Sequence, residues 1–169
     1  MVLLRDASAN KCGGICSSYE IIANLLMTER EFLRHKKAYV RDVLDILDRR
    51  AADEADLIFR RHRENERVLF ADISREISTD INAHYAELFA FFQDRPELPD
   101  QPLYRKALLN HLPAFIRENR RFRSRVRRLP VKIKCAILAS EIASGIVYHG
   151  GWGMDTESRL RVYLKNRFK

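Results

Sequence analysis

The sequence predicts an all-α helical bundle of seven or eight helices, preceded by a short N-terminal strand and loop. The 169 residues include only 6 Gly and 5 Pro, whereas a β-sandwich needs many turns. No glycine or proline occurs between residues 15 and 95, and apolar residues recur there at steps of three and four, which is the spacing of an amphipathic helix. With 46 % apolar and 32 % charged residues, the composition is that of a globular protein.

The first residues follow another pattern. "MVLLRD", residues 1–6, opens with a short apolar run that is typical of a buried strand. Residues 7–16 are predicted to be a polar loop. Ser17 and Glu20 have the spacing of a capping box, which predicts that a helix begins directly after Ser17.

A second capping box, Thr28 with Glu31, predicts a short helix near residues 29–36. A longer helix is expected to follow, and a further one is indicated by the regular stripe Phe70, Ile73, Ile77, Ile81, Tyr85, Leu88 and Phe92. "RPELPDQP" is predicted to be an exposed turn because it holds three prolines.

A helix is expected to resume at Leu103 and to break at Pro113, because proline lacks the amide hydrogen. Residues 114–129 are predicted to continue as a helix. Pro130 suits the first turn of the next helix, whose residues are apolar nearly all round, so we expect this helix at the centre of the bundle. "HGGWG" is expected to cap it, ahead of a final short helix from residue 157.

Three features of the sequence favour a cytoplasmic protein without disulfides: its N-terminus, its most apolar helix and its cysteines. Nothing resembles a signal peptide, and the most apolar helix is too short to cross a membrane. Three sparse cysteines, Cys12, Cys16 and Cys135, favour reduced thiols in the cytoplasm over disulfides, and they supply too few ligands for a metal site.

The segment "RENRRFRSRVRR" holds seven arginines in twelve residues. It indicates either a solvated basic face or, as an alternative function, a helical nucleic-acid-binding module.

The usual catalytic motifs are absent: the sequence holds no H-E-x-x-H, G-x-S-x-G, G-x-G-x-x-G or Walker pattern. The loop around residues 8–18 is the better candidate for a site. Gly13 and Gly14 let a backbone approach a ligand closely, and Asn10 offers an amide. Ser17, at the expected helix N-terminus, lies where backbone N–H groups attract anions.

The same loop carries a family resemblance. Residues 5–13, "RDASANKCG", and residues 16–20, "CSSYE", resemble a pattern of the large NAD-dependent glutamate dehydrogenases. The segments "TEREFLRHKKAYVRDVLDIL" and "LPVKIKCAILASEIASGIVY" are similar to the C-terminal helical region of these enzymes. They oxidise L-glutamate to 2-oxoglutarate while reducing NAD.

The resemblance implies a role for each loop residue. Asn10 and Gly13 would contact the cofactor, with Asn10 near its nicotinamide end. Ser17 would contact the side-chain carboxylate of glutamate, and the residue at position 14 would pack against the substrate methylenes. The family has valine at that position, so Gly14 alters the substrate fit. No catalytic residue is expected here, because the family's catalytic lysine and aspartate belong to the other domain.

The resemblance also implies a domain division. Residues 1–16 would be a remnant of a Rossmann-type nucleotide-binding domain, and residues 17–169 would form the C-terminal helical domain. NAD would bind the full-length enzyme and not this chain alone. The expected partners are the remaining domains and, in a homo-oligomer, further copies, with neither a membrane nor nucleic acid. A stand-alone regulatory or scaffold protein is the third alternative.

Overall fold

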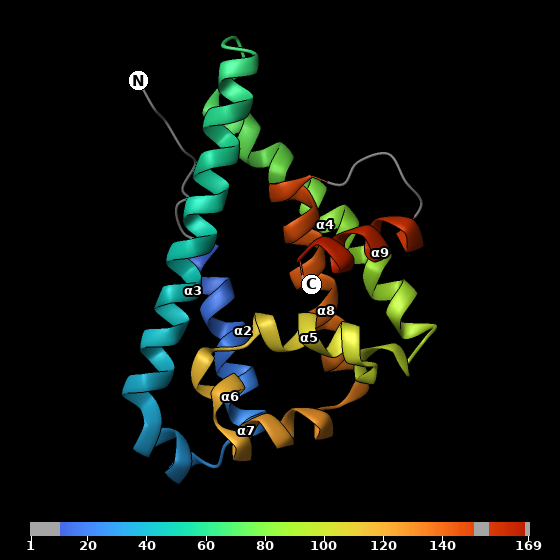
Figure 1. Cartoon of the computed structure of the whole chain (residues 1–169). Helices are drawn as coiled ribbons and strands as arrows, with labels where there is room; N and C mark the ends of the chain where they lie inside the picture. Colours follow the sequence, from blue (N-terminus) through green and yellow to red (C-terminus); the bar gives the residue numbers. More distant parts are fainter. Residues whose placement is uncertain (1–10, 151–155, 168–169) are drawn as a thin grey trace. The chain divides into compact units, whose positions relative to one another are not determined.

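The computed structural model describes residues 11–150 and 156–167, and every regular element in these ranges is a helix. The predicted all-α class is therefore confirmed, whereas the predicted strand lies outside the described residues. Eight α-helices and two short 3-10 helices follow one another along these ranges (Figure 1): α2 (Lys11–Leu26), α3 (Glu29–Glu64), α4 (Phe70–Gln93), η1 (Leu98–Asp100), α5 (Pro102–His111), α6 (Ala114–Glu118), α7 (Arg120–Arg125), η2 (Val126–Arg128), α8 (Val131–His149) and α9 (Thr156–Arg167).

The helices belong to two compact units. The described residues up to Ser78 form the first unit together with Pro113–Val126, and Thr79–Leu112 forms the second together with the described residues from Arg127 onward. The chain therefore passes from one unit to the other at residues 78/79, 112/113 and 126/127. The first of these passages lies inside α4, the helix that the stripe from Phe70 to Phe92 predicts.

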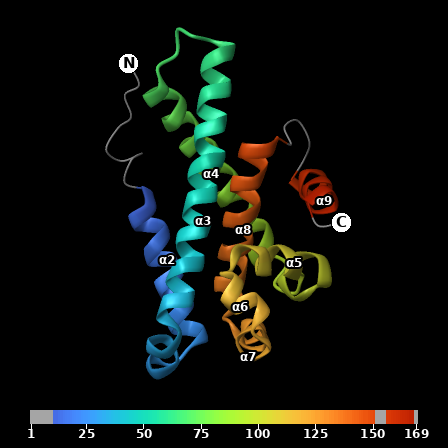
Figure 2. The same cartoon turned by 60° about the vertical axis from the view of Figure 1, so that its left-hand side comes forward.

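In the first unit, α2 and α3 lie side by side and run in opposite directions (Figures 1 and 2). Tyr19, Ile22 and Leu26 are buried on the inner face of α2. The Tyr39 hydroxyl of α3 donates a 2.7 Å hydrogen bond to the carbonyl oxygen of Tyr19. Burial raises the pKa of Tyr39, so this hydroxyl keeps its proton and the bond persists across the physiological pH range.

Two predicted helix boundaries in this unit are wrong. Helix α2 begins at Lys11, so Ser17 lies inside the helix and does not cap it. The reason is that the buried stripe starts upstream: half-buried Ile15 precedes Tyr19 by four residues on the same face. Likewise, α3 is one helix of 36 residues, because no residue near position 36 breaks it.

The capping box at the start of α3 is confirmed. The Glu31 amide donates to the Thr28 hydroxyl (3.3 Å), and the Thr28 amide donates to the Glu31 carboxylate (2.9 Å). The same carboxylate accepts two hydrogen bonds from Arg125, at 2.7 and 2.9 Å. Arg125 also donates to the carbonyl oxygen of Leu26, the last residue of α2 (2.8 Å). One ion pair therefore joins the end of α2, the start of α3 and α7.

A second long-range contact starts α6. Proline at position 113 is the N-cap of α6 and offers no side-chain acceptor, so the first amides of the helix need another partner. The carboxylate of Asp42, buried on α3, accepts a 2.5 Å hydrogen bond from the Phe115 amide. The predicted helix over residues 114–129 is interrupted, because the Asn119 side chain accepts from the Arg121 amide (3.0 Å) and starts α7 there.

The second unit is built around α8, which buries eleven residues and contacts α5, η1 and α9. Gly145 lets α9 approach closely, because a β-carbon there would lie within 2.6 Å of the Tyr163 ring. Lys134, also buried, donates a 2.6 Å hydrogen bond to Asp100 of η1. Pro99 of η1 is buried, so the prediction of a fully exposed turn is wrong.

Polar groups are also paired inside the second unit. The buried Glu141 carboxylate of α8 accepts a 2.6 Å hydrogen bond from the side-chain amide of Asn110, and it lies 3.2 Å from Nδ1 of His111. These contacts fix α5 against α8, since a buried carboxylate is costly without partners. Gly150 ends α8 with φ +90, a conformation that favours glycine, so this part of the predicted cap is confirmed.

Replacing Glu31 by glutamine should change how stability depends on pH. The bonds from Arg125, followed by the bond from the Thr28 amide, lower the pKa of Glu31 from 4.5 to about 2. The folded state therefore gains stability from this group above its unfolded pKa, and loses it as the pH falls toward about 2. Urea unfolding should show that the wild type loses more free energy of unfolding than E31Q as the pH falls from about 4.5 to about 2. Glu29→Gln is the matched control in the same helical turn, and an equal change in both variants would contradict the assignment.

Replacing Asp42 by alanine should destabilise the protein by about 1–3 kcal/mol, because the Phe115 amide loses its buried acceptor. Asp42→Asn should retain part of that stability, since its side-chain oxygen still accepts. Exposed Asp45 on the same helix is the control, and D45A should stay within about 0.5 kcal/mol of wild type. Denaturant midpoints at pH 7 would measure all three. Equal losses in D42A and D45A would show that the tertiary cap contributes nothing.

Candidate functional site

The residues singled out by the sequence lie on the first turns of α2. Gly13, Gly14 and Ser17 fall on one side of the helix, whereas Asn10 lies outside the described residues. Gly14 and Ser17 are exposed, and apart from the adjacent residues and the backbone of α2 itself, no described atom lies within 4 Å of the place where Gly14 would carry a β-carbon. The position could therefore hold a larger side chain without a clash.

Two apolar residues continue that side of the helix. Ile21 is 55 % and Leu25 is 44 % exposed. With Gly14 and Ser17 they follow steps of three and four residues, so all four share a face. We name this set, Gly14, Ser17, Ile21 and Leu25, the α2 strip. Ile21 and Leu25 thus form a small exposed apolar patch beside Gly14 and Ser17.

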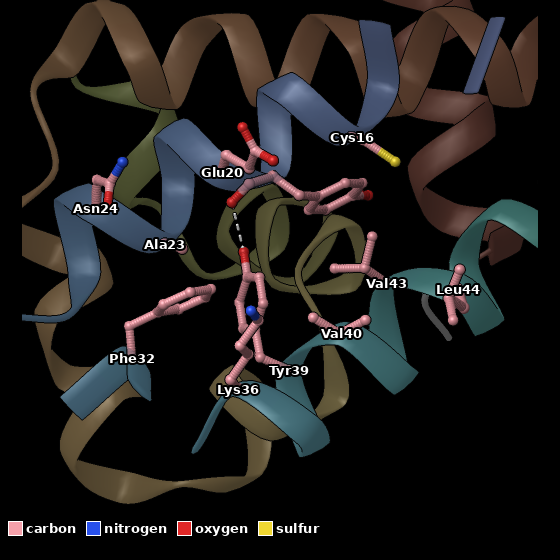
Figure 3. Close-up of a pocket in the computed structure, with 11 residues that line it drawn as sticks. Cys16, Glu20, Ala23, Asn24, Phe32, Lys36, Tyr39, Val40, Val43 and Leu44 are labelled. Atoms are coloured by element: carbon pink, nitrogen blue, oxygen red, sulfur yellow. Dashed lines mark hydrogen bonds between the residues drawn. The ribbon is translucent and has the colours of Figure 1, made fainter. Parts of the chain in front are cut away.

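A pocket of about 420 Å³ opens on a different face of α2, between this helix and α3 (Figure 3). Its apolar lining comes mostly from α3. Its polar rim is formed by Glu20 and Asn24 of α2 and by Lys36 of α3. The lining residues are Cys16, Tyr19, Glu20, Ala23, Asn24, Phe32, Lys36, Tyr39, Val40, Val43 and Leu44.

The chemistry of this pocket favours binding over catalysis. The Tyr39 hydroxyl already donates its hydrogen bond to the carbonyl oxygen of Tyr19 (Figure 3). Glu20, Asn24 and Lys36 are exposed, and among the residues the structure describes they have no hydrogen-bond or ion-pair partner. Groups of both charge signs on the rim, above an apolar floor, suit an amphipathic ligand.

Within the described ranges, no three His, Cys, Asp or Glu side chains gather where they could hold a metal ion. Cys16 and Cys135 are free thiols. Burial raises the pKa of Cys135, whose sulfur lies 3.5 Å from the carbonyl oxygen of Phe92. This thiol is therefore held protonated in the core and is a poor nucleophile.

None of the helices in the described ranges is both long and apolar enough to pass through a bilayer.

Four of the seven arginines in the arginine-rich segment fall into two groups. Arg121 and Arg125 pair with Glu31, at 2.7 Å in each case. Arg120 and Arg123 are exposed and make no ion pair among the described residues. Sequence reasoning identified Glu31 as a helix cap but missed its pairing with Arg125, because the two are 94 positions apart and no local pattern links them.

Comparison with known proteins gives relatives of one kind. The chain is 26 % identical over 160 residues to a probable NAD-specific glutamate dehydrogenase of Schizosaccharomyces pombe, covering 88 % of this chain and 14 % of that protein. It is 28 % identical over 163 residues to glutamate dehydrogenase 2 of Dictyostelium discoideum and to the NAD-specific glutamate dehydrogenase of Neurospora crassa. Each of these two matches covers 89 % of this chain and 15 % of the relative.

No protein-family model and no solved structure matches the chain. The chain spans about one seventh of the length of the curated relatives that it matches. The three relatives share one activity in their names, and each match runs along most of this chain. By its sequence, the chain is similar to a small part of NAD-specific glutamate dehydrogenases.

Proposed function

We propose that this chain is the C-terminal helical part of an NAD-dependent glutamate dehydrogenase and that it forms one wall of the cofactor and substrate cleft. The observation that carries the proposal is the similarity to three such enzymes along 88–89 % of the chain. The reaction of the complete enzyme would convert L-glutamate, NAD⁺ and water to 2-oxoglutarate, ammonium, NADH and a proton.

The α2 strip supports the role of a cleft wall. Gly14 and Ser17 are exposed, so a second domain could bring cofactor and substrate against them. Ser17 offers a hydroxyl that can donate to the side-chain carboxylate of glutamate. Gly13 and Gly14 would let the cofactor and the substrate methylenes come close to the helix backbone. Ile21 and Leu25 would be covered by the same domain.

The groups that would perform the hydride transfer belong to other parts of the enzyme. The sequence holds no glycine-rich dinucleotide turn, and the candidate residues Asn10, Gly13, Gly14 and Ser17 include no proton donor or acceptor suited to acid–base catalysis. NAD would thus be bound mainly by the remaining domains. These domains would be the principal partners of this chain, in a cytoplasmic enzyme that assembles from further copies.

The isolated chain should not reduce NAD in the presence of glutamate, as followed by absorbance of NADH. A chimera tests the proposal positively: this chain replaces the matching stretch of the Neurospora crassa enzyme. The chimera should regain glutamate oxidation, and Ser17→Ala within it should raise KM for glutamate roughly tenfold or more, because a hydrogen bond to a charged group is lost.

Ser18→Ala is the matched control for this test, since the Ser18 hydroxyl donates within α2 to the Gly14 carbonyl oxygen (3.2 Å). This variant should keep the KM of the chimera. Circular dichroism and the oligomeric state would confirm that each chimera is folded before kinetics are compared. Turnover by the isolated chain, or an equal KM in both serine variants, would overturn the proposal.

Nucleic-acid binding is the rival function, and the structure says which arginines can test it. Substituting Arg121 or Arg125 would also break the pairs with Glu31, so we choose Arg120→Gln with Arg123→Gln. We expect the wild type to bind duplex DNA with a background dissociation constant of about 10⁻⁴ to 10⁻⁶ M. The double variant should reduce the log–log salt slope by about 1.8 if both arginines meet phosphates. Sequence-selective nanomolar binding near physiological salt would favour the rival.

A further inference from the structure

An exposed apolar stripe runs along α3. Leu33 is 63 %, Val40 is 40 % and Leu44 is 53 % exposed. Their spacing of seven and four residues places them on one face of the helix. The stripe extends over twelve residues, from Leu33 to Leu44, and the eleven steps between them span about 16 Å of helix. Scattered single apolar residues on a surface are ordinary, but an aligned row of three indicates a contact surface.

The stripe is continuous with the pocket between α2 and α3. Val40 and Leu44 belong to both, and the pocket floor adds Ala23, Phe32 and Val43 (Figure 3). The result is an apolar groove bounded by two antiparallel helices. A small molecule would fill the pocket, whose volume of about 420 Å³ falls in the usual range, but it would leave most of the stripe exposed. A helix of about three turns would cover both.

Charged side chains border the groove, and the two lysines of α3, Lys36 and Lys37, outnumber the one glutamate of α2, Glu20. Lys36 and Lys37 are exposed and follow the stripe on its two sides, one turn after Leu33. Neither lysine forms an ion pair within the part of the chain that the structure describes. Their Coulomb attraction therefore remains available to acidic groups of a partner.

We propose that the groove between α2 and α3 binds an amphipathic helix of a partner protein, with acidic residues beside its apolar face. Such a helix would place its apolar side chains against Val40, Leu44 and the pocket floor, in the helix-in-groove mode of recognition. Its carboxylates would pair with Lys36 and Lys37. The groove lies on a different face of α2 from the α2 strip, so the inference does not rest on the proposed function.

The test uses two fluorescein-labelled peptides of about 21 residues with leucines at helical spacing. One carries glutamates beside the leucines, and the other carries lysines in the same places. Fluorescence anisotropy with the full chain should show saturable binding of the acidic peptide, and the basic peptide should bind at least tenfold more weakly. Absence of saturable binding, or equal binding of the two peptides, would overturn the proposal.

Substitutions then locate the binding site. Leu44→Asp should weaken binding of the acidic peptide at least tenfold. Leu69→Asp is the control, because Leu69 is 67 % exposed but lies outside the groove. The double variant Lys36→Glu with Lys37→Glu should reverse the preference so that the basic peptide binds better.

A second copy of the chain is the competing occupant. Sedimentation would then reveal a dimer that dissociates in L44D and excludes the peptide, and this result would refute the proposal. Circular dichroism of each variant would separate loss of binding from loss of folding. Equal affinities of L44D and L69D would likewise place the peptide elsewhere on the chain.

Discussion

The pairing of Glu31 with Arg125 organises the first unit. One carboxylate closes the capping box of α3 and accepts two bonds from a guanidinium that also satisfies the last carbonyl of α2. Helix ends leave backbone groups unpaired, and here a single ion pair satisfies groups at two ends at once. The turn between α2 and α3 is held by these bonds, and so the α2 strip and the pocket beside it keep a fixed relation to α3.

Sequence reasoning succeeded where a signal is local. The class, the Thr28–Glu31 capping box, the helix over residues 70–93 and the break at Pro113 each depend on neighbours within a few residues. It failed where a short motif competed with packing. The serine at position 17 matched a capping pattern, yet Ile15 extends the buried face of α2 upstream and the helix follows that face. Likewise, Pro99 is buried in η1, which packs against α5 and α8, and no turn rule contains such tertiary contacts.

The candidate site shows the same division. Gly14 and Ser17 of the α2 strip could be named from the sequence, because glycines and a serine in a polar segment are a local pattern, whereas Ile21 and Leu25 are recognised only by their exposure in the structure. The pocket could not be, since its lining alternates between α2 and α3 and depends on how these helices pair. Nor could the sequence distinguish the arginines that pair with Glu31 from the others in the segment. Seven similar side chains in one segment differ only in what lies opposite them, and a carboxylate 94 residues away makes Arg125 structural.

The chain passes three times between the two units, and this limits how the gene can be rearranged. A unit made of one continuous stretch can be duplicated, lost or moved to another gene by a single event at each end. Here each unit is completed by residues that lie between parts of the other, so no single cut yields either one whole and free of residues from its neighbour. Gene rearrangement can therefore move an intact unit only together with a segment of the other. A truncation damages both units once it passes residue 78 from the N-terminal side or residue 127 from the C-terminal side.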